Sequence, residues 1–149
     1  MQLSPLTPAD IPEVMRIERL PGYEASVGRF EADEHAEQMA REDVRYVGVR
    51  EGDALAGFVI VQEFDQPTVL LRRIAVSRQD GGVGSWLVGA VMDQVFSDTP
   101  AEALRLEVMQ TNPRGRFVYE RQGFEVYGEG NGHYFLKVPR ERWQALRGL

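Results

Sequence analysis

The chain has 149 residues, of which 43% are hydrophobic and 27% charged, so it suits one soluble globular domain spanning residues 1–149. It contains no cysteine, which excludes disulfides, thiolate metal sites and cysteine nucleophiles; its two histidines lie far apart, so we expect no bound metal. A formal net charge of −6 argues against binding to nucleic-acid phosphates.

The apolar segments argue against a membrane protein. Prolines at positions 5, 8 and 12 interrupt any N-terminal apolar run, so we expect no signal peptide. The longest mostly apolar stretch, residues 83–92, is far shorter than the ~20 residues that cross a bilayer. We therefore expect a cytoplasmic protein.

The N-terminal third is predicted to hold two helices. Thr7 followed by Pro8 and Asp10 is typical of a capped helix start, which predicts a helix over residues 8–20. A second, more polar helix is expected over residues 31–41. The residues expected to form the buried side of the first helix are Ile11, Val14, Met15 and Ile17.

Strands dominate the remainder, and a long helix interrupts them. Because the strand expected at 104–109 follows a helical crossover, it should pair in parallel with the strand at 69–76. The sequence therefore predicts an α/β fold with a mixed, mostly antiparallel twisted sheet and helices on both faces. The elements expected are strands at 46–49, 55–63 and 69–76 in an antiparallel meander, a helix at 82–96, a strand at 104–109, a helix containing Tyr119, strands at 124–127 and 134–138, and a surface helix at 139–149.

A glycine-rich turn separates the strand at 69–76 from the long helix. Its sequence is Gln79-Asp80-Gly81-Gly82-Val83-Gly84, and Ser85 follows in the first helical turn. A phosphate can approach the backbone closely where side chains are absent, and the N–H groups at a helix start attract it. A dinucleotide fingerprint does not fit, because Leu87 stands where a third glycine is needed. The turn favours phosphate binding, although a flexible helix start has the same composition.

Glu107 is a carboxylate in a strand that we expect to be central. Strand alternation places it on the opposite face from the neighbouring leucines. Both faces of a central strand should be covered, so a charge there requires either a function or an ion pair. The candidate ion-pair partners are Arg105, Arg72 and Arg73.

The segment after that strand contains Asn112, Tyr119, Gly123 and Phe124 in order. Each has a structural explanation: Asn112 suits a helix N-cap, Gly123 suits a helix C-cap, and Tyr119 suits a core aromatic. Their order, at a suitable distance after the glycine turn, is hard to obtain by chance.

Together these motifs resemble the GNAT family of N-acetyltransferases, and the resemblance covers residues 6–124. The family's acyl-CoA signature, (Gln or Arg)-x-x-Gly-x-(Gly or Ala), is similar to residues 79–84, and its second hallmark is similar to the Asn-to-Gly-Phe segment. Locally, the Leu-Glu-Val segment at 106–108 resembles ribosomal-protein N-terminal acetyltransferases, whose base and acid correspond to Glu107 and Tyr119.

The resemblance implies a GNAT-like fold in which the two parallel strands separate at their C-terminal ends and admit the pantetheine arm of acetyl-CoA. It implies that Glu107 is the base, directly or through one water, that Tyr119 is the acid, and that a backbone N–H near Val76 stabilises the oxyanion. No metal is needed. The residues expected to bind acetyl-CoA are Ile74, Ala75, Val76, Gln79, Gly81, Gly82, Val83, Gly84, Ser85, Asn112 and Tyr119.

The loop between Val76 and Gly82 departs from the family. It is shorter than is usual, and it carries Gln79 and Asp80 where basic residues are common. We expect backbone amides rather than charged side chains to bind the CoA phosphates. We therefore expect CoA to bind more weakly than in the family, or in a different position.

The acceptor side is less defined by sequence. Acidic residues cluster between positions 31 and 43, and such a run usually forms a solvated face. In the family that this chain resembles, however, this region lines the acceptor site, where acidic side chains would attract a cationic amine. Tyr23, Glu24 and Phe30 are candidates for the same wall, and we expect His133 to be an exposed turn histidine rather than an acceptor contact. The acidic residues of this run are Glu31, Asp33, Glu34, Glu37, Glu42 and Asp43.

The function implied by the resemblance is acetyl transfer from acetyl-CoA to a primary amine by direct attack, with a small cationic amine as acceptor. Acetylation of a protein N-terminus or lysine is an alternative, and a non-catalytic acyl-CoA-binding module is another. Exposed strand edges suit either a monomer or a homodimer.

Overall fold

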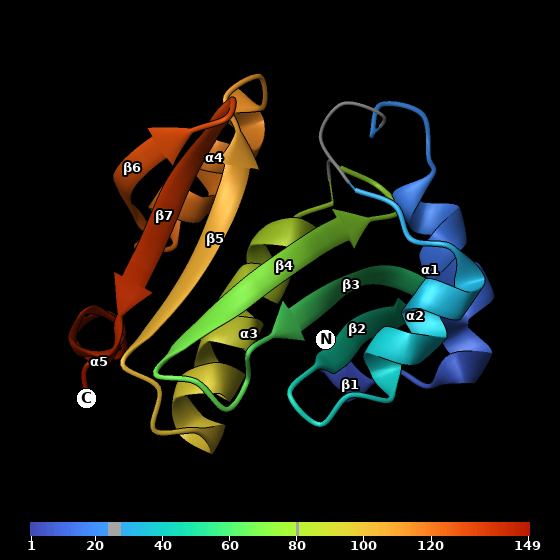
Figure 1. The fold of residues 1–149 in the computed structure, drawn as a ribbon, viewed down its shortest axis with the longest axis horizontal. Coiled ribbons are helices and arrows are strands. Elements are labelled where there is room, and N and C mark those ends of the chain that lie inside the picture. The colour runs from blue at the N-terminus through green and yellow to red at the C-terminus, as the bar shows by residue number, and fades with distance from the viewer. Residues whose placement is uncertain (24–27, 80) are drawn as a thin grey trace.

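The computed structural model describes residues 1–23, 28–79 and 81–149. Within this part of the chain, seven strands form one sheet in the order β1-β2-β3-β4-β5-β7-β6 (Figure 1). The strands are β1 (Ser4–Pro5), β2 (Arg45–Glu51), β3 (Ala54–Gln62), β4 (Thr68–Val76), β5 (Ala103–Met109), β6 (Glu125–Gly130) and β7 (His133–Pro139). The helices are the short 3-10 helix η1 (Pro8–Asp10), α1 (Ile11–Glu18), α2 (Ala32–Met39), α3 (Val83–Asp98), α4 (Pro113–Arg121) and α5 (Arg140–Arg147).

The predicted sheet is confirmed. Strands β2, β3 and β4 form the antiparallel meander, and β5 pairs in parallel with β4 after the α3 crossover. This parallel pairing is short, because it joins only residues 68–70 to residues 103–105. Beyond Leu70 the two strands diverge, as Figure 1 shows, while β5 stays paired with β7 along its whole length. The expected separation of the parallel strands is therefore present.

Strand β4 contains one bulge. Arg73 pairs with Ile60 and Leu71 pairs with Val61, so Arg72 is an extra residue without a partner position on β3. A bulge breaks the alternation of a strand and re-aims a side chain. Consecutive residues of β4 consequently share one side of the sheet at this point.

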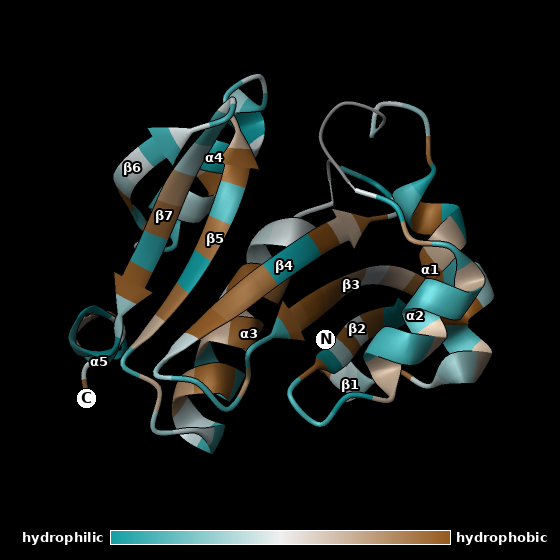
Figure 2. Cartoon of the chain, viewed as in Figure 1, coloured by the Kyte–Doolittle hydropathy of each residue, from teal (hydrophilic) through white to brown (hydrophobic). Residues whose placement is uncertain are grey.

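Helices cover both faces of the sheet, and each face has its own core. Helix α1 packs on β2, β3 and β4 through residues that include Val14, Ile17 and Phe58. Helix α3 packs on the other face through residues that include Leu87 and Met92. Figure 2 shows mostly hydrophobic colour along β3, whereas β5 and β7 alternate between hydrophobic and hydrophilic. Such alternation is typical of strands with one solvated face.

Strand β5 differs from expectation in its burial. Leu104, Leu106 and Val108 are buried, but Glu107 on the other face is exposed. The expectation that both faces of this strand are covered is wrong. The physical reason is the short pairing with β4, which leaves the far end of β5 beside an opening.

The N-terminal elements are confirmed with small corrections. Asp10 accepts a hydrogen bond from the Thr7 N–H at 2.8 Å, as the predicted cap requires, and the first turn is 3-10 rather than α-helical. The buried side of α1 contains Glu18, while Met15 is half-buried. The last helix, expected at the surface, is anchored by the buried Trp143. None of the described helices is long and apolar enough to cross a membrane.

Candidate active site

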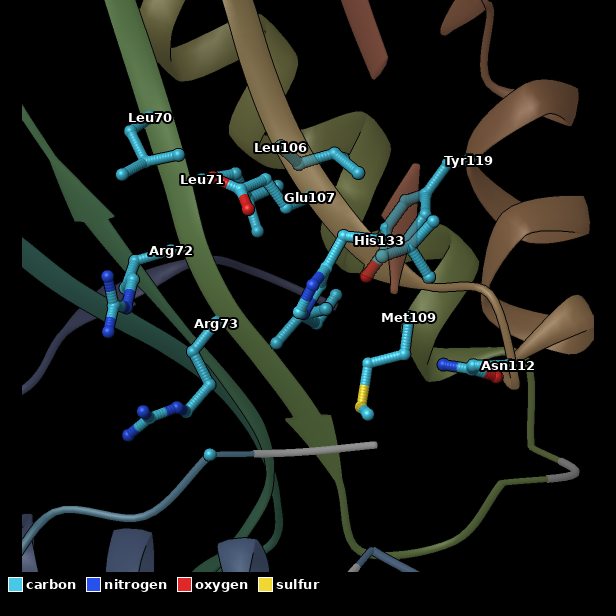
Figure 3. Close-up of a pocket in the computed structure, with 13 residues that line it drawn as sticks. Leu70, Leu71, Arg72, Arg73, Leu106, Glu107, Met109, Asn112, Tyr119 and His133 are labelled. Carbon is cyan, nitrogen blue, oxygen red and sulfur yellow. The ribbon is translucent and has the colours of Figure 1, made fainter. Parts of the chain in front are cut away.

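A cavity of about 490 Å³ lies where β4 and β5 separate. Residues 70–74 of β4 form one wall, and residues 106–109 of β5 form the other. Tyr119 from α4 and His133 from β7 also face this space (Figure 3). The divergence of two central strands therefore gathers side chains from distant parts of the sequence around one opening.

Glu107 projects into this cavity with 47% of its side chain exposed. Its Oε2 atom lies 3.9 Å from Arg105, which makes a closer ion pair of 3.0 Å with Glu63. The expected pairing with Arg105 is thus present but loose. Because Arg105 is already engaged by Glu63, the Glu107 carboxylate keeps lone pairs for a proton or an ammonium group.

Tyr119 reaches the same cavity from α4, and its ring makes an edge contact with Phe124. Burial raises the pKa of Tyr119 well above its ordinary value, and the nearby Tyr23 phenol raises it further. The hydroxyl therefore stays protonated at every physiological pH. It can donate a proton or a hydrogen bond to a group in the cavity.

Asn112 is the N-cap of α4, as its structural explanation predicts. Its Oδ1 accepts a hydrogen bond from the Gly115 N–H at 3.0 Å, which satisfies one of the unpaired donors at the helix start. The residue also lines the cavity. Its part in cofactor binding stays a prediction.

The backbone groups of Val76, at the end of β4, point away from β3. The Ser77 N–H donates to the Ala56 carbonyl on β3, so strand alternation directs the N–H and C=O groups of Val76 to the opposite side. There the Tyr23 hydroxyl occupies both groups: it donates to the Val76 carbonyl at 2.7 Å and accepts from the Val76 N–H at 3.0 Å. The amide expected to stabilise an oxyanion thus bonds to a phenol in this structure.

Ile74 and Ala75 differ in how they meet the opening. Ile74 lines the cavity, whereas the Ala75 side chain is buried in the core beneath α1. By the same alternation as Val76, Ile74 directs its backbone groups toward the gap and Ala75 directs them toward β3. Direct backbone pairing with a ligand is therefore available to Ile74 and not to Ala75.

The glycine turn forms the start of α3. Gly82 is the N-cap residue with a left-handed φ of 75°, a conformation that favours glycine, and no atom of a described residue other than its chain neighbours lies within 4 Å of the place that a Cβ would take. Val83 is buried, while Gly84 and Ser85 are half-buried in the first turn of α3. Asp80 lies outside the described residues. The exposed glycines and the helix N-terminus fit an anionic pyrophosphate.

Arg114 stands beside this turn and was not singled out from the sequence. It donates to the Gln79 carbonyl at 2.6 Å and to the Gln79 side-chain oxygen at 3.3 Å. Arg78, in the turn itself, is exposed and lies 4.0 Å from Glu51. The loop therefore has basic groups near it, although its own motif positions hold none. The only sequence signal for Arg114 is its place in the first turn of α4.

A buried polar cluster beneath α1 and α2 also escaped the sequence analysis. Glu18 accepts from Arg73 at 3.2 Å, and His35 Nε2 lies 2.9 Å from the same carboxylate. The other ring nitrogen of His35 lies 2.7 Å from the Tyr46 hydroxyl, whose pKa burial raises. A neutral His35 satisfies both neighbours, because one ring nitrogen donates to Glu18 and the other accepts from Tyr46.

The acidic run between residues 31 and 43 does not border the cavity. Of its members within the described residues, none lines the opening, and Glu31 and Glu34 instead form a capping box at the start of α2. The expected acidic rim is therefore wrong for this cavity, since α2 lies over the outer part of the sheet. His133 is half-buried and lines the cavity rather than being an exposed turn residue. Glu24 lies outside the described residues.

A model of the acetyltransferase (GNAT) family matches residues 11–124. Solved structures of similar fold include the PaiA N-acetyltransferase of Thermoplasma acidophilum in complex with coenzyme A, with a TM-score of 0.82 at 15% identity over 93% of this chain and 98% of that one. A mutant of the spermidine N-acetyltransferase SpeG of Vibrio cholerae matches with a TM-score of 0.81 at 17% identity, over 99% of each chain. The ribosomal-protein-S18-alanine N-acetyltransferase of Escherichia coli matches with a TM-score of 0.75 at 22% identity, over 93% of this chain and 92% of that one.

Proposed function

Because the chain belongs to the GNAT family of acetyl-CoA-dependent N-acetyltransferases, we propose that it transfers the acetyl group to the primary amine of a small molecule by direct attack. The observation that carries this proposal is the meeting of Glu107 and Tyr119 at one cavity. One side chain is a carboxylate with free lone pairs, and the other is a phenol that keeps its proton. These are the groups that acyl transfer to an amine requires.

The residues that would hold acetyl-CoA fit the chemistry of that molecule. The gap-facing backbone of Ile74 and Val76 suits the amides of a pantetheine arm, in the manner of an added strand. The glycine turn and the start of α3 suit the pyrophosphate, with Ser85 as a hydroxyl donor and Arg114 nearby. When bound, acetyl-CoA supplies the acetyl group as an activated thioester.

Glu107 performs the first proton transfer in this proposal. An amine with an ordinary pKa arrives as its ammonium ion, which is cationic and cannot attack a carbonyl carbon. Glu107 removes that proton directly or through one water and leaves a neutral nucleophile. Tyr119 holds the proton that the departing sulfur needs, because its raised pKa keeps the phenol protonated. No charged side chain other than Glu107 has to change its protonation state.

A second candidate is acetylation of a protein N-terminus or a lysine side chain. It is favoured by the local resemblance of residues 106–108, together with the interval from Glu107 to Tyr119, to ribosomal-protein N-terminal acetyltransferases. A peptide acceptor requires an open groove, whereas a small amine requires an enclosed pocket. Comparing short peptides with small amines under identical conditions separates the two candidates.

The test is thiol release from acetyl-CoA by a Glu107→Gln variant, measured across pH. If Glu107 is the base, kcat should fall by about 10²-fold or more, and the acid limb of the wild-type profile should disappear. Glu63→Gln is the matched control, because Glu63 bonds to the same Arg105 but does not line the cavity. An unchanged acid limb in Glu107→Gln would remove that residue from the role of base.

A further inference from the structure

Two consecutive arginines line the β4 wall of the cavity. In a regular strand Arg72 and Arg73 would lie on opposite faces, but the bulge at Arg72 breaks the alternation. Figure 3 shows both guanidinium groups on the same side of β4, the side away from Glu107 and Tyr119. Both arginines are among the residues that line the cavity, so its β4 wall carries two positive side chains.

The two guanidinium groups are in different environments. Arg73 is only 7% exposed, bonds to Glu18 at 3.2 Å and stacks over the Phe30 ring at 4.3 Å. Its charge is therefore compensated within the protein, and its position is fixed. Arg72 is exposed, and it makes no hydrogen bond, ion pair or ring contact with any residue that the structure describes. It retains all five of its N–H donors for a ligand.

The charge of the lining limits what the acceptor can be. Among the described residues of the lining, Glu107 is the one acidic side chain, and the proposed reaction uses it as the base. A second ammonium group on the acceptor would therefore meet guanidinium charge without a carboxylate to pair with. An anionic group would meet the planar, unpaired guanidinium of Arg72, which suits carboxylate and phosphate oxygens in a two-bond arrangement.

We propose that the acceptor is a small molecule that carries a carboxylate or phosphate beside its primary amine, and that Arg72 binds this anionic group while Glu107 receives the amine. The proposal rests on the acetyltransferase function and adds the class of acceptor. Free amino acids and phosphorylated amines have the required chemistry, whereas polyamines do not.

The experiment measures thiol release and the acetylated product for amines that differ only in the anionic group. The probes are glycine, L-alanine, L-leucine, L-phenylalanine and L-lysine, each with its carboxamide, and phosphoethanolamine with ethanolamine. Spermidine and a short peptide without acidic side chains complete the set. The carboxylate and phosphate pairs separate the two sources of negative charge. A thermal shift with acetyl-CoA is recorded for every variant to show that it is folded and binds the cofactor.

Three substitutions test the role of Arg72. Arg72→Met keeps much of the length but removes the charge, Arg72→Lys keeps the charge but not the two-bond geometry, and Arg16→Met removes an exposed arginine of α1 outside the cavity. An amino acid and its carboxamide differ in amine pKa, which by itself affects their rates. This effect is the same for wild type and variant, so it cancels when the two proteins are compared on one pair of amines. The readout is the ratio of kcat/KM for the anionic amine to that for its neutral partner.

The wild type should prefer at least one anionic amine over its neutral partner, and Arg72→Met should lower this ratio by about tenfold or more. Arg72→Lys should retain part of the preference, while the Arg16→Met ratio and the rates for neutral partners should not change. A preference that survives Arg72→Met would overturn the proposal. So would a wild type that prefers spermidine, the peptide or the neutral partners. Absence of transfer to every amine, despite acetyl-CoA binding, would instead contradict the proposed function itself.

Discussion

Replacing Tyr23 by phenylalanine tests how the β4 backbone is used. The Tyr23 hydroxyl makes two hydrogen bonds with Val76, at 2.7 and 3.0 Å, and the residue is only 7% exposed. Those Val76 groups are the ones that a pantetheine arm would need. In the free wild type the phenol satisfies them, and if acetyl-CoA pairs with Val76 as proposed, the phenol would have to release them. Tyr23→Phe removes this competition, but it also removes a stabilising contact from the free protein.

The expected magnitude follows from the two hydrogen bonds. Each contributes about 1 kcal/mol net, so the free variant should lose about 2 kcal/mol of unfolding free energy. For a chain of this length, that loss lowers Tm by about 4–8 °C. If the cofactor pairs with Val76 in both proteins, the difference in unfolding free energy between variant and wild type should be smaller for the complexes than for the free proteins. Acetyl-CoA should then bind to Tyr23→Phe up to about 30-fold more tightly than to the wild type.

The assay combines thermal unfolding with isothermal titration of acetyl-CoA. The Tm difference between variant and wild type should shrink at saturating acetyl-CoA. Tyr127→Phe is the matched control, because Tyr127 is an exposed tyrosine whose hydroxyl makes no hydrogen bond to the described residues. Weaker acetyl-CoA binding by Tyr23→Phe would refute the reasoning and would show that the phenol contacts the cofactor instead of competing with it.

Three further predictions concern Tyr119, its protonation and Glu18. Tyr119→Phe should lower kcat by about 10²-fold while leaving the Kd of acetyl-CoA nearly unchanged; equal losses in both would mean that Tyr119 only packs. Burial raises the pKa of Tyr119, so its hydroxyl loses its proton only at a pH above the ordinary range for tyrosine. The wild-type rate should therefore show no decline from deprotonation of Tyr119 below about pH 10. Glu18→Leu should cost about 3–5 kcal/mol in urea unfolding, since it leaves the buried Arg73 without its carboxylate. A loss below about 1 kcal/mol, comparable with that of the control Arg16→Gln at an exposed position of the same helix, would show that the cluster contributes little.

Much of the fold could be predicted because local patterns agree with tertiary structure in this chain. The glycine turn, the apolar periodicity of α3 and the strand after it determine the parallel pairing of β4 and β5. The strand β1 was missed because two residues carry no periodic signal. The helix α2 was predicted two residues too long at its C-terminal end, where fraying makes boundaries uncertain in any sequence pattern.

The site was predictable only where a motif carries it. Glu107 and Tyr119 follow from the family motifs, and both line the cavity. The exposure of Glu107 was not predicted, because alternation along one strand does not reveal where its neighbour diverges. The pairing of Tyr23 with Val76 joins residues that are 53 positions apart. A bulge such as that at Arg72 depends on the register of two strands, which composition does not encode.

The buried cluster around Glu18 was missed for a related reason. Glu18 falls on the apolar side of α1, where the periodicity alone would place a hydrophobic residue. Its partners His35 and Arg73 come from other elements, so their pairing is a property of the packed structure. The acidic run at residues 31–43 led to the opposite error. Its charges suggested a rim of the acceptor site, but none of these residues, all within the described part of the chain, lines the cavity.

The measurement that tests the central claim most directly is amine-dependent release of the CoA thiol from acetyl-CoA, with the acetylated product identified by mass spectrometry. Wild-type protein should release thiol in equal amounts to N-acetylated small amine, and Glu107→Gln should release it at least about 10²-fold more slowly. Equal thiol release by the wild type and by Glu107→Gln, or thiol release without any N-acetylated amine, would contradict the account.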